Sequence, residues 1–322
     1  MDLIFLLGRS NDPHIESLSR ELNKIDENHV IIDRIDLQDS FNVKFNNGEV
    51  KSEINIRGKV YRLDKIKSVW NYSPIQVVMS RKINKKMSKF VREEWIEGIV
   101  SLWNIMDGRW VNDPNALINA SNRLGQLRLA ADVGLQTPKT LITNDKNRFL
   151  DFFNDCKSNI VAKTLHGSEG VPHNGMIYTT KILRKDLQYA DKLVYAPCIF
   201  QEHIPKKTEL RITIIGNTLK VAEIQSQRSR KTMHDWRRYD TFTKTPYRKA
   251  TIPMDEAHKL LRLMKALNLE FGAVDMIKTP NNELVFLEIN PNGAWLWIEQ
   301  LTGMKISKDI AHLLADNRVA PR

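Results

Sequence analysis

The stretch Val285–Gly303, VFLEINPNGAWLWIEQLTG, constrains the fold of this chain more than any other. It predicts an apolar strand that ends in a carboxylate and an amide, followed by a Pro-Asn-Gly turn and a Trp-rich helical segment. Glu288 and Asn290 share one face of such a strand, because side chains in a strand alternate with period two. The pair therefore indicates either a strand that has reached solvent or two oxygen ligands aimed in the same direction.

Asp275 lies within another apolar stretch, GAVDMI, thirteen residues before Glu288. This spacing suits two antiparallel strands joined by a short turn at PNNE. A buried carboxylate is costly without a cation or hydrogen-bond donors, so Asp275 requires a partner. Two alternatives remain open at this point. The partner is a neighbouring Arg or Lys, or the oxygens of Asp275, Glu288 and Asn290 surround a hard cation such as Mg²⁺.

The composition is that of an ordinary globular protein, with 42% hydrophobic and 27% charged residues in a chain of 322. This length suits two or three domains. No run approaches eighteen apolar residues, and the N-terminus lacks the features of a signal peptide, so no membrane span is expected. Cys156 and Cys198 show no disulfide or metal-binding pattern and are expected to be inert in a reducing compartment. We therefore expect a cytoplasmic protein.

The net charge of +11 calls for an explanation in terms of a partner. Lys and Arg residues are scattered along the chain, and no helix carries a basic stripe with interleaved aromatic residues, which argues against nucleic acid. The densest cluster of cations lies between Ser226 and Lys249. A loop of this kind is able to hold phosphates or an acidic peptide, and it is equally consistent with a solvated surface.

The pattern of apolar residues predicts an α/β fold. The first 36 residues read as strand, helix and strand, which indicates a βαβ unit. A hairpin at Asn47-Gly48 and a long helix over 88–107 follow. A helix over 122–134 stops at Gly134, and the rest of the chain alternates strands with helices. Trp295 and Trp297 are expected to pack the last helical segments onto a sheet.

Lys163 follows the apolar strand 160–162 and precedes TLHGSEGVP. A Lys at a strand end beside a glycine-rich loop suits phosphate oxygens, because glycine lets backbone N–H groups approach an anion closely. The order of residues is not that of a P-loop, since the Lys precedes the glycines. An exposed hairpin with a solvated Lys is the alternative.

The segment QEHIPKKTELR, residues 201–211, predicts a strand, a break at Pro205 and a second strand. Such a crossover exposes backbone N–H and C=O groups that suit the edge of a purine. Glu209 and Arg211 share one face of the second strand, where they suit ribose hydroxyls and a phosphate or carboxylate. A surface ion pair between strands is the alternative, and the eight histidines show no metal-binding spacing.

The order of these features resembles the ATP-grasp superfamily over about residues 110–310. Arg123 at a helix start, Lys163 before the glycine-rich loop, QEHI, ELR, GAVD and FLEINPNG occur in this order. DWRRYD at 235–240, together with FLEINPNGAWLWIE, is similar to the graspetide synthetases, the microviridin- and plesiocin-type peptide macrocyclases. The resemblance implies an N-terminal pre-ATP-grasp domain over 1–110, a central ATP-grasp subdomain over 111–203 and a C-terminal subdomain over 204–322.

The resemblance also implies a role for each site residue. The ligands of Mg²⁺ would be Asp275, Glu288 and Asn290. The residues that would bind ATP are Arg123, Lys163, Gly167, Ser168, Glu169, Gly170, Val171, Gln201, Glu202, His203, Ile204, Glu209 and Leu287. The residues that would face the γ-phosphate and the acceptor carboxylate are Arg211 and Arg237.

The implied activity is an ATP-dependent carboxylate ligase that phosphorylates Asp or Glu side chains of a precursor peptide and closes ester or amide macrocycles. The implied partners are an acidic peptide with leader and core segments and a second copy of the chain, without nucleic acid or membrane. One alternative is a ligase that adds amino acids to a protein tail or a small acid. The other is a non-catalytic basic binding protein.

Overall fold

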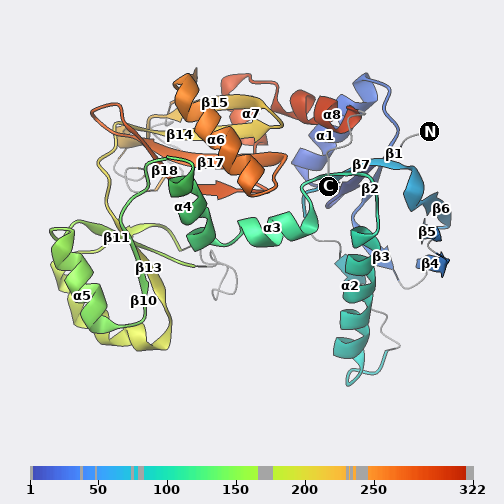
Figure 1. Cartoon of the computed structure of the whole chain (residues 1–322), viewed down its shortest axis with the longest axis horizontal. Helices are drawn as coiled ribbons and strands as arrows, with labels where there is room; N and C mark the ends of the chain where they lie inside the picture. The colour runs from blue at the N-terminus through green and yellow to red at the C-terminus, as the bar shows by residue number, and fades with distance from the viewer. Residues whose placement is uncertain are drawn as a thin grey trace.

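The computed structural model has a mixed α/β fold, and the strands of the described residues are arranged in five sheets (Figure 1). The α/β class predicted from the sequence is confirmed. Among the described residues, no helix is long and apolar enough to cross a membrane. The structure describes residues 3–36, 39–47, 49–73, 76–78, 83–165, 177–229, 232, 235–236 and 246–316.

The first sheet is parallel and contains the predicted βαβ unit. Helix α1 (Pro13–Lys24) connects β1 to β2, and its N-cap Asp12 accepts a hydrogen bond from the His14 backbone N–H. The stretch 29–36, predicted as one strand, is two strands in different sheets, since 29–32 pairs with β1 and 34–36 pairs with 76–78; the Asp33 carboxylate between them is bonded to Ser10 and Arg57. The strands of the first sheet, in spatial order, are β2 (His29–Ile32), β1 (Leu3–Leu7), β7 (Ile66–Asn71) and β9 (Arg109–Val111).

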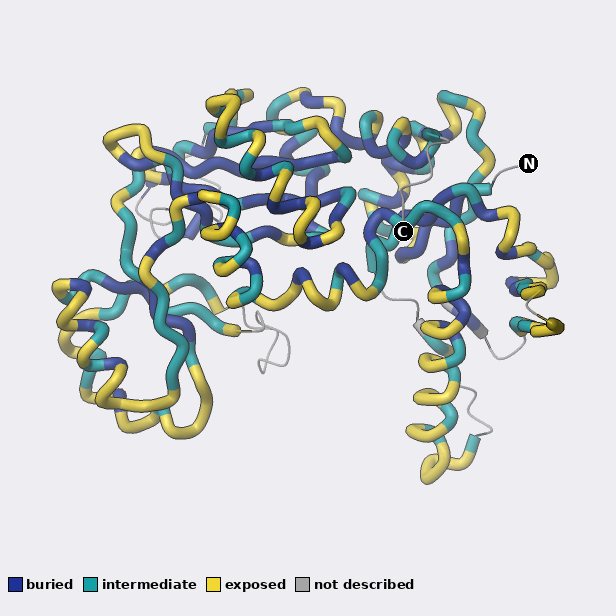
Figure 2. Tube along the Cα trace, in the orientation of Figure 1, coloured by how far each residue is buried: buried dark blue, intermediate teal, exposed yellow. Residues whose placement is uncertain are grey.

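A three-stranded meander and a long helix complete this half of the molecule. Helix α2 (Ser88–Asn104) projects from the body and is buried only through Ile99, Leu102 and Trp103 (Figures 1 and 2). The Phe41 ring of the meander packs edge-on against Trp95 of α2, with 5.9 Å between centroids. The remaining elements here are β3 (Arg34–Asp36), paired with β8 (Gln76–Val78), and β4 (Ser40–Asn46), β5 (Glu49–Ile56), β6 (Lys59–Arg62) and η1 (Leu63–Lys65).

Two short helices bridge the halves of the molecule (Figure 1). Helix α3 (Pro114–Ala120) begins at Asp113, whose carboxylate accepts hydrogen bonds from two backbone N–H groups of its first turn. Helix α4 (Arg123–Asp132) begins at Asn122 and ends just before Gly134, whose φ of 86° is readily adopted only by glycine. The predicted helix over 122–134 is confirmed, whereas α3 was not predicted.

A small antiparallel sheet contains the strand that ends at Lys163, just before the glycine-rich sequence. It is covered by α5 (Lys146–Asp155) and the 3-10 helix η3 (Arg184–Tyr195), whose apolar side chains form a core around Phe149, Phe153 and Phe200. The strands of this sheet, in spatial order, are β10 (Thr140–Thr143), β13 (Cys198–Glu202), β11 (Ile160–Lys163) and β12 (Thr180–Lys181).

The large sheet has five antiparallel strands. Helices α4 and α6 (Met254–Ala266) cover one of its faces, and most of the buried residues of α6 pack there. The last helices, α7 (Leu296–Thr302) and α8 (Ile306–Ala315), follow the edge strand. The strands, in spatial order, are β16 (Tyr247–Ala250), β15 (Thr218–Ile224), β14 (Thr208–Ile215), β17 (Phe271–Lys278) and β18 (Leu284–Asn290); η4 (Ser226–Arg228) follows β15.

Helix α8 joins the first sheet to the large sheet. Its Leu314 carbonyl accepts a hydrogen bond from the Ser68 hydroxyl of β7, at 2.8 Å, and the Ser17 hydroxyl of α1 donates to Ser307 at 3.0 Å. Trp295 is fully buried in the apolar core that these elements share, as predicted. The large sheet contributes Ile215, Ala222 and Phe271 to this shared core, on the face opposite to the one that α4 and α6 cover.

Candidate functional site

Three charged side chains form a row across the middle of the large sheet. Arg211 of β14 is directly opposite Asp275 of β17, which is directly opposite Glu288 of β18. Residues opposite each other in neighbouring strands point to the same face. The predicted antiparallel pairing of the two acidic strands is therefore confirmed, and Asn290 lies two pairs further along, opposite Ala273.

A β-bulge shapes the acidic end of this row. The register shifts so that Met276 pairs with Phe286 while Asp275 pairs with Glu288, and Leu287 is the extra residue. Strict alternation would place Leu287 and Glu288 on opposite faces of the strand. In the structure both line the same cavity. The bulge thus brings an apolar and an acidic side chain to one site.

Both carboxylates of the row are paired with arginines. The Arg211 guanidinium Nη1 is 3.0 Å from Asp275 Oδ2; the Arg211 side chain is buried, and the Asp275 side chain is 14% exposed. Arg123, at the start of α4, places Nη1 3.3 Å from Glu288 Oε2. An Arg partner for Asp275, one of the alternatives left open above, is therefore present.

The same residues also fit a hard cation. Asp275 Oδ1 is buried and has no hydrogen-bond partner, so one oxygen of the buried carboxylate remains to be satisfied. Glu288 and Asn290 would add a carboxylate oxygen and an amide oxygen. Mg²⁺ prefers oxygen ligands of this kind. The described residues contain no group of three His, Cys, Asp or Glu side chains suited to a metal.

Burial raises the pKa of the Asp275 carboxyl to about 6. The Arg211 guanidinium opposes this shift because it stabilises the ionised form. The negative charges of Glu288 and Glu209 raise the pKa of Asp275 further. The carboxylates of this face therefore repel one another and favour the binding of positive charge.

A cavity between the small sheet and the large sheet brings together five of the predicted nucleotide and metal residues. Its lining combines cationic, acidic, amide and apolar side chains from both sheets and from α4. The Gln201 side chain is held in place by a hydrogen bond to the Thr140 hydroxyl at 3.0 Å. The predicted residues that line the cavity are Arg123, Lys163, Gln201, Leu287 and Glu288.

Four of the other residues predicted to bind the nucleotide lie outside this cavity. Glu209 is buried, with Oε2 3.2 Å from the Lys206 ammonium and Oε1 without a partner. Ile204 lines a separate cavity beside Val285. His203 is bonded through its backbone to Asn159. Glu202 follows Gln201 in β13, so its side chain points to the other face of the strand.

The predicted residues Gly167, Ser168, Glu169, Gly170, Val171 and Arg237 lie outside the described residues. Described residues next to these two segments are anchored near the site. The Asp235 carboxylate accepts a hydrogen bond from the Thr179 backbone N–H at 3.0 Å. Trp236 packs against Trp297 with ring centroids 4.8 Å apart. Asp235 thus links the cation-rich stretch 226–249 to Thr179, which precedes β12. Trp236 links the same stretch to α7.

Three residues of the site were not identified from the sequence. Gln126 and Asn112 are buried amides bonded to the backbone of the acidic strands, and Gly293 packs against Arg211. Asn112 and Gln126 contact residues about 160 positions away, as their hydrogen bonds show. Only Gly293 had a signal, as the last residue of the Pro-Asn-Gly turn.

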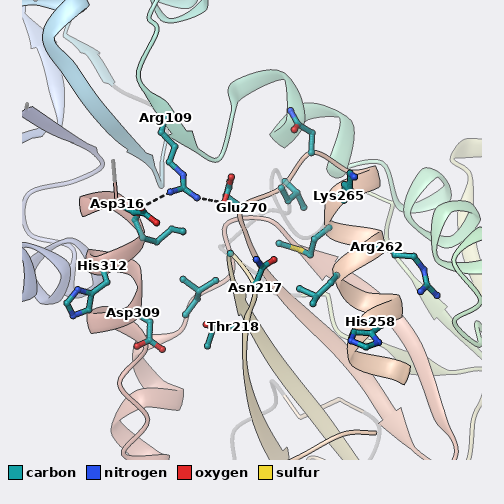
Figure 3. Close-up of a pocket in the computed structure, with 17 residues that line it drawn as sticks. Arg109, Asn217, Thr218, His258, Arg262, Lys265, Glu270, Asp309, His312 and Asp316 are labelled. Atoms are coloured by element: carbon teal, nitrogen blue, oxygen red, sulfur yellow. Dashed lines mark hydrogen bonds and ion pairs between the residues drawn. The ribbon is translucent and has the colours of Figure 1, made fainter. Parts of the chain in front are cut away.

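A different cavity lies between α6, the β14–β15 turn and α8 (Figure 3). Arg109 of β9 reaches into it, with Nη2 2.8 Å from Glu270 Oε2 and Nη1 donating to the Leu313 carbonyl at 3.2 Å. Among the described residues, no predicted site residue lines this cavity. It marks the joint between the first sheet and the large sheet.

The comparisons with known proteins identify the class. The RimK-like ATP-grasp domain matches residues 120–314, more than half of the chain. The chain belongs to the RimK-like ATP-grasp family. A "Probable alpha-L-glutamate ligase" from Histophilus somni is 26% identical over 206 residues, which span 61% of this chain and 64% of the relative.

Two solved structures match over nearly the full length of both chains. The first is the Chryseobacterium gregarium RiPP-associated ATP-grasp ligase in complex with ADP and a leader and core peptide. It has a TM-score of 0.88 and 27% identity, and the match covers 100% of this chain and 98% of that one. The second is the macrocyclase MdnC from Microcystis aeruginosa, bound with its precursor peptide. It has a TM-score of 0.83 and 25% identity, and the match covers 98% and 99% of the two chains.

Proposed function

We propose that this protein is an ADP-forming ligase that activates Asp or Glu side chains of an acidic precursor peptide and closes ester or amide macrocycles. The observation that carries the proposal is the row of Arg211, Asp275 and Glu288 across the sheet, with Glu288 lining one cavity with Lys163. The similarity to two peptide-bound ATP-grasp ligases over almost the whole chain supports it.

Asp275, Glu288 and Asn290 would hold Mg²⁺, and Lys163 and Arg123 would contact phosphates of ATP. A bound magnesium ion would supply positive charge at the phosphate oxygens, where negative charge builds up during transfer. Leu287 and Gln201 line the same cavity. Leu287 would pack against the purine ring of ATP, and Gln201 would lie at the edge of the adenine. Arg123 is paired with Glu288 in the structure. We expect this ion pair to break when ATP and Mg²⁺ bind, with Arg123 then contacting phosphate and Glu288 contacting the metal.

Arg211 and Arg237 would act on the transferred phosphate and the acceptor carboxylate. The Arg211 guanidinium is held between the Asp275 carboxylate and the Ala294 carbonyl, so it needs little reorganisation to receive negative charge. Arg237 directly follows Trp236, which is anchored on Trp297 of α7. A planar guanidinium suits bidentate contact with a carboxylate.

The proposed reaction has two steps. A side-chain carboxylate of the peptide attacks the γ-phosphorus of ATP, ADP leaves, and an acyl phosphate forms on the peptide. A hydroxyl or amine of the same peptide then attacks the acyl carbon, and inorganic phosphate leaves. Both steps depend chiefly on positioning and on the neutralisation of charge, which the cationic side chains of the site provide.

The net charge of +11 supports an acidic peptide as substrate, since opposite charges speed association. The cation-rich stretch from Ser226 to Lys249 is our candidate docking surface. A cytoplasmic homodimer that binds neither nucleic acid nor membrane, and the division into 1–110, 111–203 and 204–322, remain predictions. Strand β9, which ends at Val111, completes the first sheet near the first of these boundaries.

A second candidate function is the addition of free glutamate to a protein tail or a small acid. The curated relative named as an α-L-glutamate ligase favours it. The two functions differ in the peptide product, because ring closure removes one water per ring whereas ligation adds an amino-acid residue. Acidic peptides with Thr- and Glu-rich repeats, incubated with ATP and Mg²⁺, would be weighed by mass spectrometry. A mass gain that depends on free glutamate would overturn the macrocyclase proposal.

A further inference from the structure

Two buried side-chain amides hold the backbone on either side of Asn290. Gln126 of α4 donates from Nε2 to the Ile289 carbonyl and accepts at Oε1 from the Ile289 N–H, both at 2.9 Å. Asn112 donates from Nδ2 to the Pro291 carbonyl at 2.8 Å. Gln126 is 3% exposed and Asn112 1% exposed. The backbone neighbours of Asn290 are thus each fixed by an amide from the segment that links the first sheet to the large one.

Each amide takes the place of a missing strand. Strand β18 lies at the edge of the sheet, so the outward N–H and C=O groups of Ile289 have no strand partner, and Gln126 satisfies both. Strand β18 ends opposite Ala273, so Phe271 at the start of β17 has no partner in β18. Asn112 donates to the Phe271 carbonyl and accepts from the Phe271 N–H at 2.8 and 2.9 Å. The Gln126 Nε2 also donates a hydrogen bond to the Ala120 carbonyl at 2.5 Å, so Gln126 joins the end of α3 to β18, whereas Asn112 joins Phe271 to Pro291.

The Asn112 amide also ties this segment to the first sheet. Asn112 directly follows β9, and its carbonyl accepts a hydrogen bond from Asn71 of β7 at 3.2 Å. Its Oδ1 accepts a further hydrogen bond from the Glu270 N–H, and the Glu270 carboxylate is paired with Arg109 of β9 (Figure 3). The position of residues 289–291 is therefore set from outside the large sheet.

We propose that Gln126 and Asn112 are positioning residues that hold Glu288 and Asn290 at the spacing that a divalent cation needs. The inference rests on the proposed function, because it concerns the same metal site. Glu288 precedes Ile289 and is flanked on its other side by the β-bulge at Leu287, where ladder pairing is interrupted, so the backbone position of Glu288 depends on how Ile289 is held. Ligands held by hydrogen bonds in an outer shell bind metal more tightly than ligands that must be ordered on binding.

The test uses the full chain with Mn²⁺ as a paramagnetic probe for Mg²⁺, titrated in the presence of ADP and followed by electron paramagnetic resonance. Gln126→Met keeps the side-chain length but removes every hydrogen bond. Gln126→Glu and Asn112→Asp keep the acceptor and remove the donors. We expect the dissociation constant of Mn²⁺ to rise about 10- to 100-fold in each variant, because loss of an outer-shell partner has this effect on metal sites.

Ser68→Ala is the matched control for lost stability. It removes a buried hydrogen bond to the Leu314 carbonyl but touches no residue of the 289–291 segment. Urea unfolding reports the stability of each protein, and the Glu variant replaces the Met variant if the latter does not fold. An Mn²⁺ affinity equal to wild type in folded Gln126 and Asn112 variants would overturn the positioning role. Failure of the wild type to bind Mn²⁺ with ADP would instead overturn the metal site itself, and the inference with it.

Discussion

Replacing Gly293 by alanine tests the close packing of Gly293 against the Arg211 side chain. A Cβ atom at this position would lie 2.5 Å from Arg211 Nη2 and would contact the Ala273 Cβ even more closely. The Ala273 methyl group is fixed on β17 and has no other rotamer. The backbone at residue 293 must therefore shift away from β17, the Arg211 guanidinium must also move, and the Arg211–Asp275 contact at 3.0 Å is expected to lengthen or break.

The expected effect has two parts. Inserting a methyl group into a packed interior costs about 1–3 kcal/mol of unfolding free energy. A displacement of about 1 Å at a reacting group lowers kcat by up to about 100-fold. We therefore expect Gly293→Ala to fold with reduced stability and to lose at least tenfold in kcat, while the KM for ATP changes less because Lys163 and Leu287 are untouched.

Gly125→Ala is the matched control, since Gly125 lies in α4 next to Gln126. A Cβ there would meet only atoms of Asn122 at 3.6–3.7 Å, which is ordinary contact. Alanine is favoured over glycine within a helix by about 0.5–1 kcal/mol, so this variant should be at least as stable as the wild type.

Urea unfolding and peptide-dependent ADP release would be measured for both variants and the wild type. Equal kcat and equal unfolding free energy for Gly293→Ala and wild type would refute the reasoning. A loss of stability with unchanged kcat would show that Arg211 keeps its role when displaced.

The remaining predictions concern single residues of the site and its charge. Lys163→Ala should weaken binding of a non-hydrolysable ATP analogue, because it removes a positive charge near the phosphates; an unchanged dissociation constant by calorimetry would contradict this role. Glu288→Gln should abolish Mg²⁺-dependent turnover with the fold intact, and normal ADP release would remove it from the metal site. Arg237→Ala should retain nucleotide binding but lose ring closure in mass spectrometry, and full ring formation would move the acceptor role elsewhere. Peptide affinity by fluorescence anisotropy should fall steeply between low and high salt, since screening shortens from about 10 Å at 0.1 M to about 3 Å at 1 M. A flat salt series would mean that the cation-rich stretch does not dock the peptide.

The parts of the site that sequence reasoning identified depend on local rules. The pairing of Asp275 with Glu288 follows from two apolar strands and a short turn between them, and the structure confirms it. Lys163 lies at the end of its strand, as the pattern of apolar residues predicts. These features need only neighbouring residues, so a single sequence contains the information.

Other features depend on contacts that no local rule describes. The bulge at Leu287 has no glycine to signal it and arises from the pairing of β17 with β18. Gln126 and Asn112 read as ordinary polar residues of a helix and a loop, and only the folded chain shows that they complete two strands. The division of 29–36 into two strands likewise depends on which distant strands each part pairs with, 3–7 for the first and 76–78 for the second.

The way the outer edge of β18 is covered bears on the solubility of the protein. An exposed strand edge offers free N–H and C=O groups to strands of other molecules and promotes aggregation. Here the Phe286 N–H is bonded to the Gln136 carbonyl at 2.8 Å, and Gln126 occupies both groups of Ile289. The opposite edge, β16, is short and exposes Arg248 and Lys249. Within the described residues, Gln126 and Gln136 occupy backbone groups of the β18 edge, and the β16 edge is short and charged, both of which disfavour intermolecular pairing. Changes at Gln126 will therefore have to be assessed for aggregation as well as for metal binding.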